Sequence, residues 1–74
     1  MRRSRTDIAQ EILKVAMQGA NKTHIVNEAN INFNIVSKYL EMLNEKELIR
    51  RENGVFITTD KGKLFQETAK KLKF

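Results

Sequence analysis

The sequence has 74 residues and no cysteine; 41% of the residues are hydrophobic, 31% are charged, and the net charge at pH 7 is +5. A chain this short forms at most one domain and buries too little surface to wall a deep catalytic cleft, so we expect no enzyme. The lack of cysteine excludes disulfides and thiolate metal sites. The positive charge favours a polyanionic partner, nucleic acid before an anionic membrane surface, although charge alone is equally compatible with simple solubility.

The expected location follows from the apolar runs, the longest of which are two or three residues. A membrane span needs about 20 apolar residues. The basic start of the chain imitates a signal peptide, but Asp7, Gln10 and Glu11 interrupt any apolar stretch behind it. We therefore expect a cytoplasmic, nucleoid-associated protein with no membrane partner.

The first predicted helix runs from Thr6 to Gly19. Thr6 is a good N-cap residue, and Asp7 suits the positive end of a helix. Gly19 ends the helix because glycine readily adopts the left-handed conformation. The apolar residues between them recur at helical spacing and predict one wide buried face: Ile8, Ala9, Ile12, Leu13, Val15 and Ala16.

Two more helices follow, separated by a turn of about three residues, which is the usual length in a helix-turn-helix. The second helix spans Thr23 to Ala29, with Thr23 as its cap and Asn30 as its left-handed end. The third opens at the cap residue Asn32 and runs to about Lys46. Its apolar stripe, widened by two aromatic residues, comprises Val36, Leu40, Leu43, Phe33 and Tyr39.

A hairpin is predicted over residues 48–59. Two short runs of strand-forming residues are separated there by Asn53-Gly54, a strong hairpin signal because a type I′ turn needs positive φ at both positions. This turn places Arg51 opposite Phe56. We expect the Phe56 face to point inward and Ile57 to be more exposed.

The last predicted helix starts at Thr59 or Asp60 and spans about residues 60–73, with Gly62 in its first turn, where a small residue permits close packing. The order helix, helix, helix, hairpin, helix predicts a mainly α fold with a β-hairpin, a winged helix-turn-helix, in a single domain over residues 1–74. A homeodomain-like bundle has three helices without a hairpin, so the hairpin argues against it.

The predicted DNA contacts lie first on the third helix and the hairpin. In helix-turn-helix proteins the second helix of the pair enters the major groove, and its first residues meet base edges. Asparagine can pair with adenine, lysine can donate to guanine or phosphate, and an apolar side chain can touch a thymine methyl. The candidates are Asn32, Asn34, Ile35, Ser37, Lys38, Arg50, Arg51 and Asn53. The alternative is an ordinary solvated surface, and Glu52 places a negative charge near the wing tip.

Further contacts are predicted at two helix starts. They comprise a basic arm ahead of the first helix and the N-terminus of the second helix, where backbone N–H groups and a hydroxyl can hold a phosphate. These candidates are Arg2, Arg3, Arg5, Lys22 and Thr23. The alternatives are a disordered terminus for the arm and a simple cap role for Thr23. His24 is the sole histidine and lacks partner ligands, so no metal and no cofactor are expected.

Five runs of residues stand in a characteristic order: Gly19-Ala20-Asn21-Lys22-Thr23, Glu28-Ala29-Asn30-Ile31, Lys38-Tyr39-Leu40-Glu41-Met42-Leu43, Leu48-Ile49 and Thr59-Asp60-Lys61-Gly62-Lys63. They cover roughly Ile8 to Leu72 and resemble the small archaeal winged-helix family. This family includes the ten-kilodalton archaeal chromatin proteins and similar small regulators, some carried by archaeal viruses. The resemblance implies a homodimer that binds DNA.

The resemblance also bears on the form of the dimer. In the chromatin branch the last helix is long and forms an antiparallel coiled coil with its partner. Here we expect only about three to four turns, which favours a shorter helix-to-helix contact. Its predicted residues are Leu64, Phe65, Thr68, Ala69, Leu72 and Phe74. Alternatively, Leu64, Phe65 and Ala69 pack on the first helix of the same subunit and leave Leu72 and Phe74 for the partner.

The sequence thus predicts a double-stranded DNA-binding protein, either a transcriptional regulator or a chromatin-type protein. Helix 32–46 would enter the major groove, and the 48–59 hairpin would act as the wing. No small-molecule substrate is expected. The alternative is a winged-helix module that binds other proteins and not DNA, through Ile35, Ile57 and Phe74.

Overall fold

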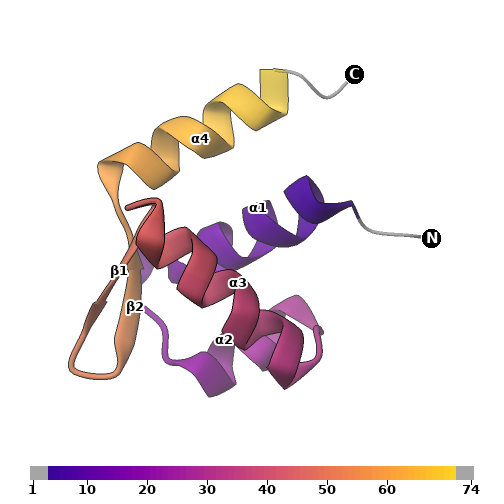
Figure 1. Cartoon of the computed structure of the whole chain (residues 1–74), viewed down its shortest axis with the longest axis vertical. Helices are drawn as coiled ribbons and strands as arrows, with labels where there is room; N and C mark the ends of the chain where they lie inside the picture. Colours follow the sequence, from indigo (N-terminus) through magenta and orange to yellow (C-terminus); the bar gives the residue numbers. More distant parts are fainter. Residues whose placement is uncertain (1–3, 72–74) are drawn as a thin grey trace.

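A computed structural model describes residues 4–71 of the chain, with side chains described over residues 4–68. The elements in order are α1 (Arg5–Val15), the 3-10 turn η1 (Ala16–Gln18), α2 (Lys22–Ala29), α3 (Phe33–Glu45), β1 (Ile49–Glu52), β2 (Val55–Thr58) and α4 (Asp60–Lys71). The predicted order of helices and hairpin is confirmed. In Figure 1, α1 lies between α4 and the pair α2 and α3, with which it makes contact, and the hairpin projects to one side.

The prediction that Thr6 caps the first helix is wrong, because Ser4 caps α1. The Ser4 hydroxyl accepts the Asp7 N–H at 3.1 Å, and the Asp7 carboxylate accepts the Ser4 N–H at 3.3 Å, which makes a capping box. Arg5 is therefore the first residue of the helix and not part of an arm ahead of it. At the other end the helix tightens into η1, and Gly19 ends that turn with a φ of 87°.

The two helices of the helix-turn-helix begin at asparagine caps. Asn21, and not Thr23 as predicted, caps α2: its Oδ1 accepts a backbone N–H at 2.8 Å. Asn30 ends α2 in the left-handed conformation, as predicted. Asn32 caps α3 as predicted, and its Oδ1 accepts the Asn34 N–H at 2.8 Å. Short polar side chains thus fix the start of both helices.

The core forms where α1, α2 and α3 meet the hairpin. Its largest fully buried side chains are Ile12, Leu13, Ile25, Leu43, Ile49 and Val36. Phe33 was predicted to widen the buried stripe of α3, and this is wrong: its side chain is 53% exposed. The Lys22 Nζ lies 5.0 Å from the centre of the Phe33 ring, a cation–π contact between α2 and α3 at the surface.

The hairpin has the predicted register, with Arg51 opposite Phe56. Asn53 and Gly54 both have positive φ, 50° and 79°. The Phe56 side chain is buried, and Ile57 is half-buried. An unpredicted pairing covers the outer edge of β2: Ala20 donates to the Phe56 carbonyl at 3.0 Å and accepts the Phe56 N–H at 2.8 Å. This pairing ties the wing to the segment between η1 and α2.

The connection from α3 to β1 is a left-handed turn at Glu47, whose φ is 62°. Its N–H donates to the Asn44 carbonyl at 3.0 Å, and the Leu48 N–H donates to the Leu43 carbonyl at 2.9 Å. These two bonds form a Schellman motif, in which glycine is the usual left-handed residue. The Thr59 hydroxyl donates to the Glu47 carbonyl at 2.6 Å, so the start of α4 is anchored to the same turn.

Candidate nucleic-acid interface

The outer face of α3 is divided along its length. Asn34, Lys38, Glu41 and Glu45 are all exposed and stand three or four residues apart, so they share one face of the helix. The first half of this face carries an amide and a cation, whereas the second half carries two carboxylates. A polyanion lying along α3 would be attracted by the first half and repelled by the second.

The predicted residues on the front of α3 differ in what they can offer. Asn34 and Lys38 project freely, Ile35 is 41% exposed, and Ser37 is half-buried. Asn32 is exposed, but its Oδ1 already accepts the Asn34 N–H. A bidentate pair with adenine needs both the oxygen and the amino group of an asparagine, so Asn34 suits that contact better than Asn32.

The N-termini of α2 and α3 lie side by side. The contact of the Lys22 ammonium with the Phe33 ring at 5.0 Å joins them. Thr23 and His24 are exposed in the first turn of α2. Both helix ends carry partial positive charge from their unpaired N–H groups, so the junction suits a phosphate. The sequence pattern did not identify Phe33 as part of this surface, because its spacing also matched the buried stripe.

The wing carries two arginines on opposite faces of the hairpin. The Arg50 Nη2 lies 3.4 Å from the Glu52 Oε2, with both side chains more than half exposed. The Arg51 guanidinium lies 5.8 Å from the centre of the Phe56 ring, the residue predicted to lie opposite it. Asn53 is exposed at the tip. Arg50 is thus held by a carboxylate and Arg51 by an aromatic face, and both remain open to solvent.

The sequence and the fold both match known proteins over nearly the whole chain. A family model described as winged helix-turn-helix matches residues 2–73. The chain belongs to the winged helix-turn-helix family. Among solved structures, the fold is similar to the crystal structure of Sso10a-2, a DNA-binding protein from Sulfolobus solfataricus, with a TM-score of 0.84 and 27% identity over 95% of this chain and 78% of that chain. No curated protein matches the sequence. The resemblance to the small archaeal winged-helix family is confirmed.

The remaining predicted site residues of this winged helix-turn-helix domain lie on α1 and α4. Arg5 is exposed on α1. Arg2 and Arg3 lie outside the described residues. On α4, Thr68 is exposed, Leu64 is 63% exposed, and Phe65 packs against the core. Leu64 is therefore mostly exposed, and Phe65 is the more buried of the two. Leu72, Phe74 and the side chain of Ala69 lie outside the described part of the chain.

Two further properties of the winged helix-turn-helix domain concern ions and membranes. Over residues 4–71 there is no cluster of three or more histidine, aspartate or glutamate residues that could hold a metal ion. None of the described helices is both long and apolar enough to cross a membrane.

Proposed function

We propose that this domain binds double-stranded DNA, as a transcriptional regulator or a chromatin-type protein, with α3 in the major groove and the β1–β2 hairpin as the wing. The proposal rests on the outer face of α3. Asn34 and Lys38 are exposed on the first half of this face, while the inner face of the helix is buried. The net charge of +5, the winged helix-turn-helix family, and the similarity to a DNA-binding protein support it.

The roles proposed for α2 and α3 follow from side-chain chemistry. Asn34 pairs with the edge of an adenine, and Lys38 donates to guanine or to a phosphate. Ile35 contacts a thymine methyl. Lys22 and Thr23 hold a phosphate at the N-terminus of α2. Ser37 and Asn32 contribute less to the DNA contact, because Ser37 is half-buried and the Asn32 oxygen caps α3.

The wing is proposed to follow a phosphate chain or the minor groove. Arg50, Arg51 and Asn53 are exposed there, and arginine is favoured in narrow minor grooves. Glu52 opposes this contact twice, because it adds negative charge near the tip and pairs with Arg50 at 3.4 Å. Arg5, with Arg2 and Arg3, is proposed to add phosphate contacts outside the helix-turn-helix.

Fluorescence anisotropy of a labelled duplex, titrated at several salt concentrations, tests the α3 contact. Lys38→Ala should weaken binding and reduce the slope of log affinity against log salt by about 1, because one phosphate contact and its counterion are lost. Lys63→Ala removes the same charge from an exposed position on α4 and should change neither. If the anisotropy of the labelled duplex does not rise as protein is added at low salt, DNA binding is refuted. Equal effects of the two variants refute the placement of α3.

A second pair of variants tests the wing separately. Glu52→Gln releases Arg50 and removes a negative charge, so DNA affinity should rise if the hairpin touches the duplex. Glu67→Gln makes the same change at an exposed position on α4 and should leave affinity nearly unchanged. An increase of the same size in both variants would reflect net charge alone and would contradict a wing contact.

Genome-wide footprinting separates the two biological roles. A few sharp sites would mean a regulator, and broad coverage would mean a chromatin-type protein.

The base contact proposed for Asn34 has its own test. With Asn34→Ala, the protein should bind DNA nearly as tightly but discriminate less well at the adenine position, since base contacts determine sequence specificity and phosphate contacts fix the protein's orientation on the duplex.

We also propose that the domain forms a homodimer through α4. Leu64 supports this, because a leucine that is 63% exposed on the outer side of a helix gains by burial against a partner. Sedimentation velocity over a concentration series provides the test. Leu64→Glu should shift the protein to monomer, whereas Phe33→Glu, at another exposed apolar side chain, should not. A wild-type protein that stays monomeric at all concentrations refutes the dimer.

A further inference from the structure

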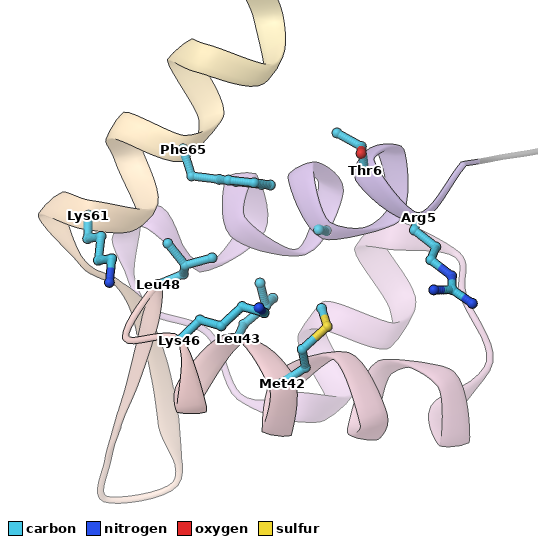
Figure 2. A pocket seen from close by; sticks show the side chains of 9 residues that line it. Arg5, Thr6, Met42, Leu43, Lys46, Leu48, Lys61 and Phe65 are labelled. Carbon is cyan, nitrogen blue, oxygen red and sulfur yellow. The ribbon is translucent and has the colours of Figure 1, made fainter.

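A groove of about 510 Å³ opens between α1, α3 and α4, on the side of the domain shown in Figure 2. Its floor and walls are mainly apolar, formed by Met42 and Leu43 of α3, Leu48 and Phe65, with Ala9 of α1 beneath. The volume lies within the range of about 300–1,000 Å³ that is usual for small-molecule sites. Part of this apolar surface is open to solvent, since the Met42 side chain is 37% exposed.

Three cations border the same groove, each from a different part of the chain. Arg5 comes from the start of α1, Lys46 from the end of α3, and Lys61 from the first turn of α4. All three are exposed, and none forms an ion pair with a described carboxylate. The described residues that line the groove include no acid. Three cations and no described acid thus border an apolar surface.

We propose that this groove binds a small amphipathic anion, a carboxylic acid with an alkyl or aromatic body. The apolar body would lie on Met42, Leu48 and Phe65, and the carboxylate would lie among the cations at the rim. A neutral apolar molecule would gain only from burial of its apolar surface, and a bare phosphate only from attraction to the cations. A ligand with both parts gains from both.

The proposal does not depend on DNA binding. Met42 and Lys46 lie toward the C-terminal end of α3, whereas the proposed DNA contacts Asn34 and Lys38 lie on its first half. Of the residues proposed to contact DNA, Arg5 alone also borders the groove. Ligand binding is measured on the protein without DNA, so either proposal can fail while the other holds.

Octanoate is a suitable probe, titrated below its micelle-forming range into isotope-labelled protein and followed by NMR. Saturable shifts are expected at the methyl groups of Met42, Leu43 and Leu48 and at the Phe65 ring, with little change at Ile25, which is fully buried on α2. Octan-1-ol and octylammonium should bind more weakly, because they lack the negative charge. Absence of saturable shifts, shifts centred elsewhere, or equal binding of the alcohol overturns the proposal.

Two matched pairs of variants locate the binding. Met42→Glu puts a carboxylate on the groove floor and should weaken octanoate binding about tenfold, through charge repulsion and lost apolar contact. Met17→Glu is the same change at a methionine that is 43% exposed on η1 and should have no effect. Persistence of wild-type affinity in Met42→Glu overturns the proposal.

The second pair tests the cations at the rim of the groove. Neither substitution should affect folding, because both lysines are exposed. Lys61→Gln should weaken octanoate binding about two- to fivefold, as expected for one exposed ion pair. Lys63→Gln, two residues along the same helix and also exposed, should not change it. Equal losses in both variants would mean that net charge alone attracts the ligand and would overturn the site. The Lys61 and Lys63 pair remains decisive even if Met42→Glu does not fold.

Discussion

Gly62→Ala should destabilise the domain, although glycine to alanine in an open helix is normally favourable. Gly62 is buried in the first turn of α4. A Cβ there would overlap the Leu48 carbonyl oxygen and would lie 2.7 Å from the Thr58 Cγ2 and 3.1 Å from the Leu48 carbonyl carbon. Two of these atoms are backbone, so the overlap can be relieved only by moving α4 away from the segment between α3 and β1.

Hydrogen bonds at this junction resist such a movement. The Thr59 N–H donates to the same Leu48 carbonyl at 3.1 Å, and the Thr59 hydroxyl accepts the Gly62 N–H at 3.0 Å. Helix propensity favours alanine by about 1 kcal/mol. Overpacking costs about 1–3 kcal/mol, and each weakened hydrogen bond about 1 kcal/mol. With both hydrogen bonds weakened, the net loss should therefore be about 2–4 kcal/mol.

A loss of that size is large for this domain. Its total stability should be about 4–11 kcal/mol from its length of 74 residues. The melting temperature should fall by about 10–30 °C. Urea unfolding followed by circular dichroism measures the change, with Lys63→Ala on the exposed side of α4 as a control expected to stay within about 0.5 kcal/mol. If Gly62→Ala is as stable as the wild type, α4 does not need this close approach and the reasoning is wrong.

Three other substitutions test single contacts by the same unfolding measurement. Thr58→Val removes the hydroxyl that donates to the buried Leu13 carbonyl at 2.6 Å, and should cost about 1–3 kcal/mol; no loss would mean that this carbonyl finds another donor. Glu47→Gly should stabilise by about 0.5–1 kcal/mol, because it relieves a left-handed residue at the end of α3, and a loss would show that the backbone entropy of glycine outweighs that relief. Ser4→Ala removes the capping hydroxyl of α1 and should cost about 1 kcal/mol, whereas Thr6→Ala should cost less; the reverse order would restore Thr6 as the cap.

The sequence determined the elements whose signals are local. Asn53-Gly54 fixed the hairpin and its register, because positive φ at both positions suits few residues other than asparagine and glycine. Asn30 marked the end of α2 because asparagine tolerates positive φ, and Asn32 marked the start of α3 because its side chain can cap a helix. The exposed front of α3, with Asn34 and Lys38, followed from helical spacing alone. The DNA-binding role proposed for these residues remains a prediction.

The tertiary structure decided whatever depends on residues distant in the sequence. Phe33 matched the spacing of a core residue, yet it lies at the surface, in contact with Lys22 of α2. The Ser4 cap is the exception, since Asp7 three residues later completes a capping box, a local signal that the sequence interpretation missed. The edge pairing of Ala20 with Phe56 and the groove between α1, α3 and α4 join segments that no local pattern connects. Capping and turn geometry are set by a few neighbouring torsion angles, whereas packing partners are set by how all the elements bury their apolar faces together.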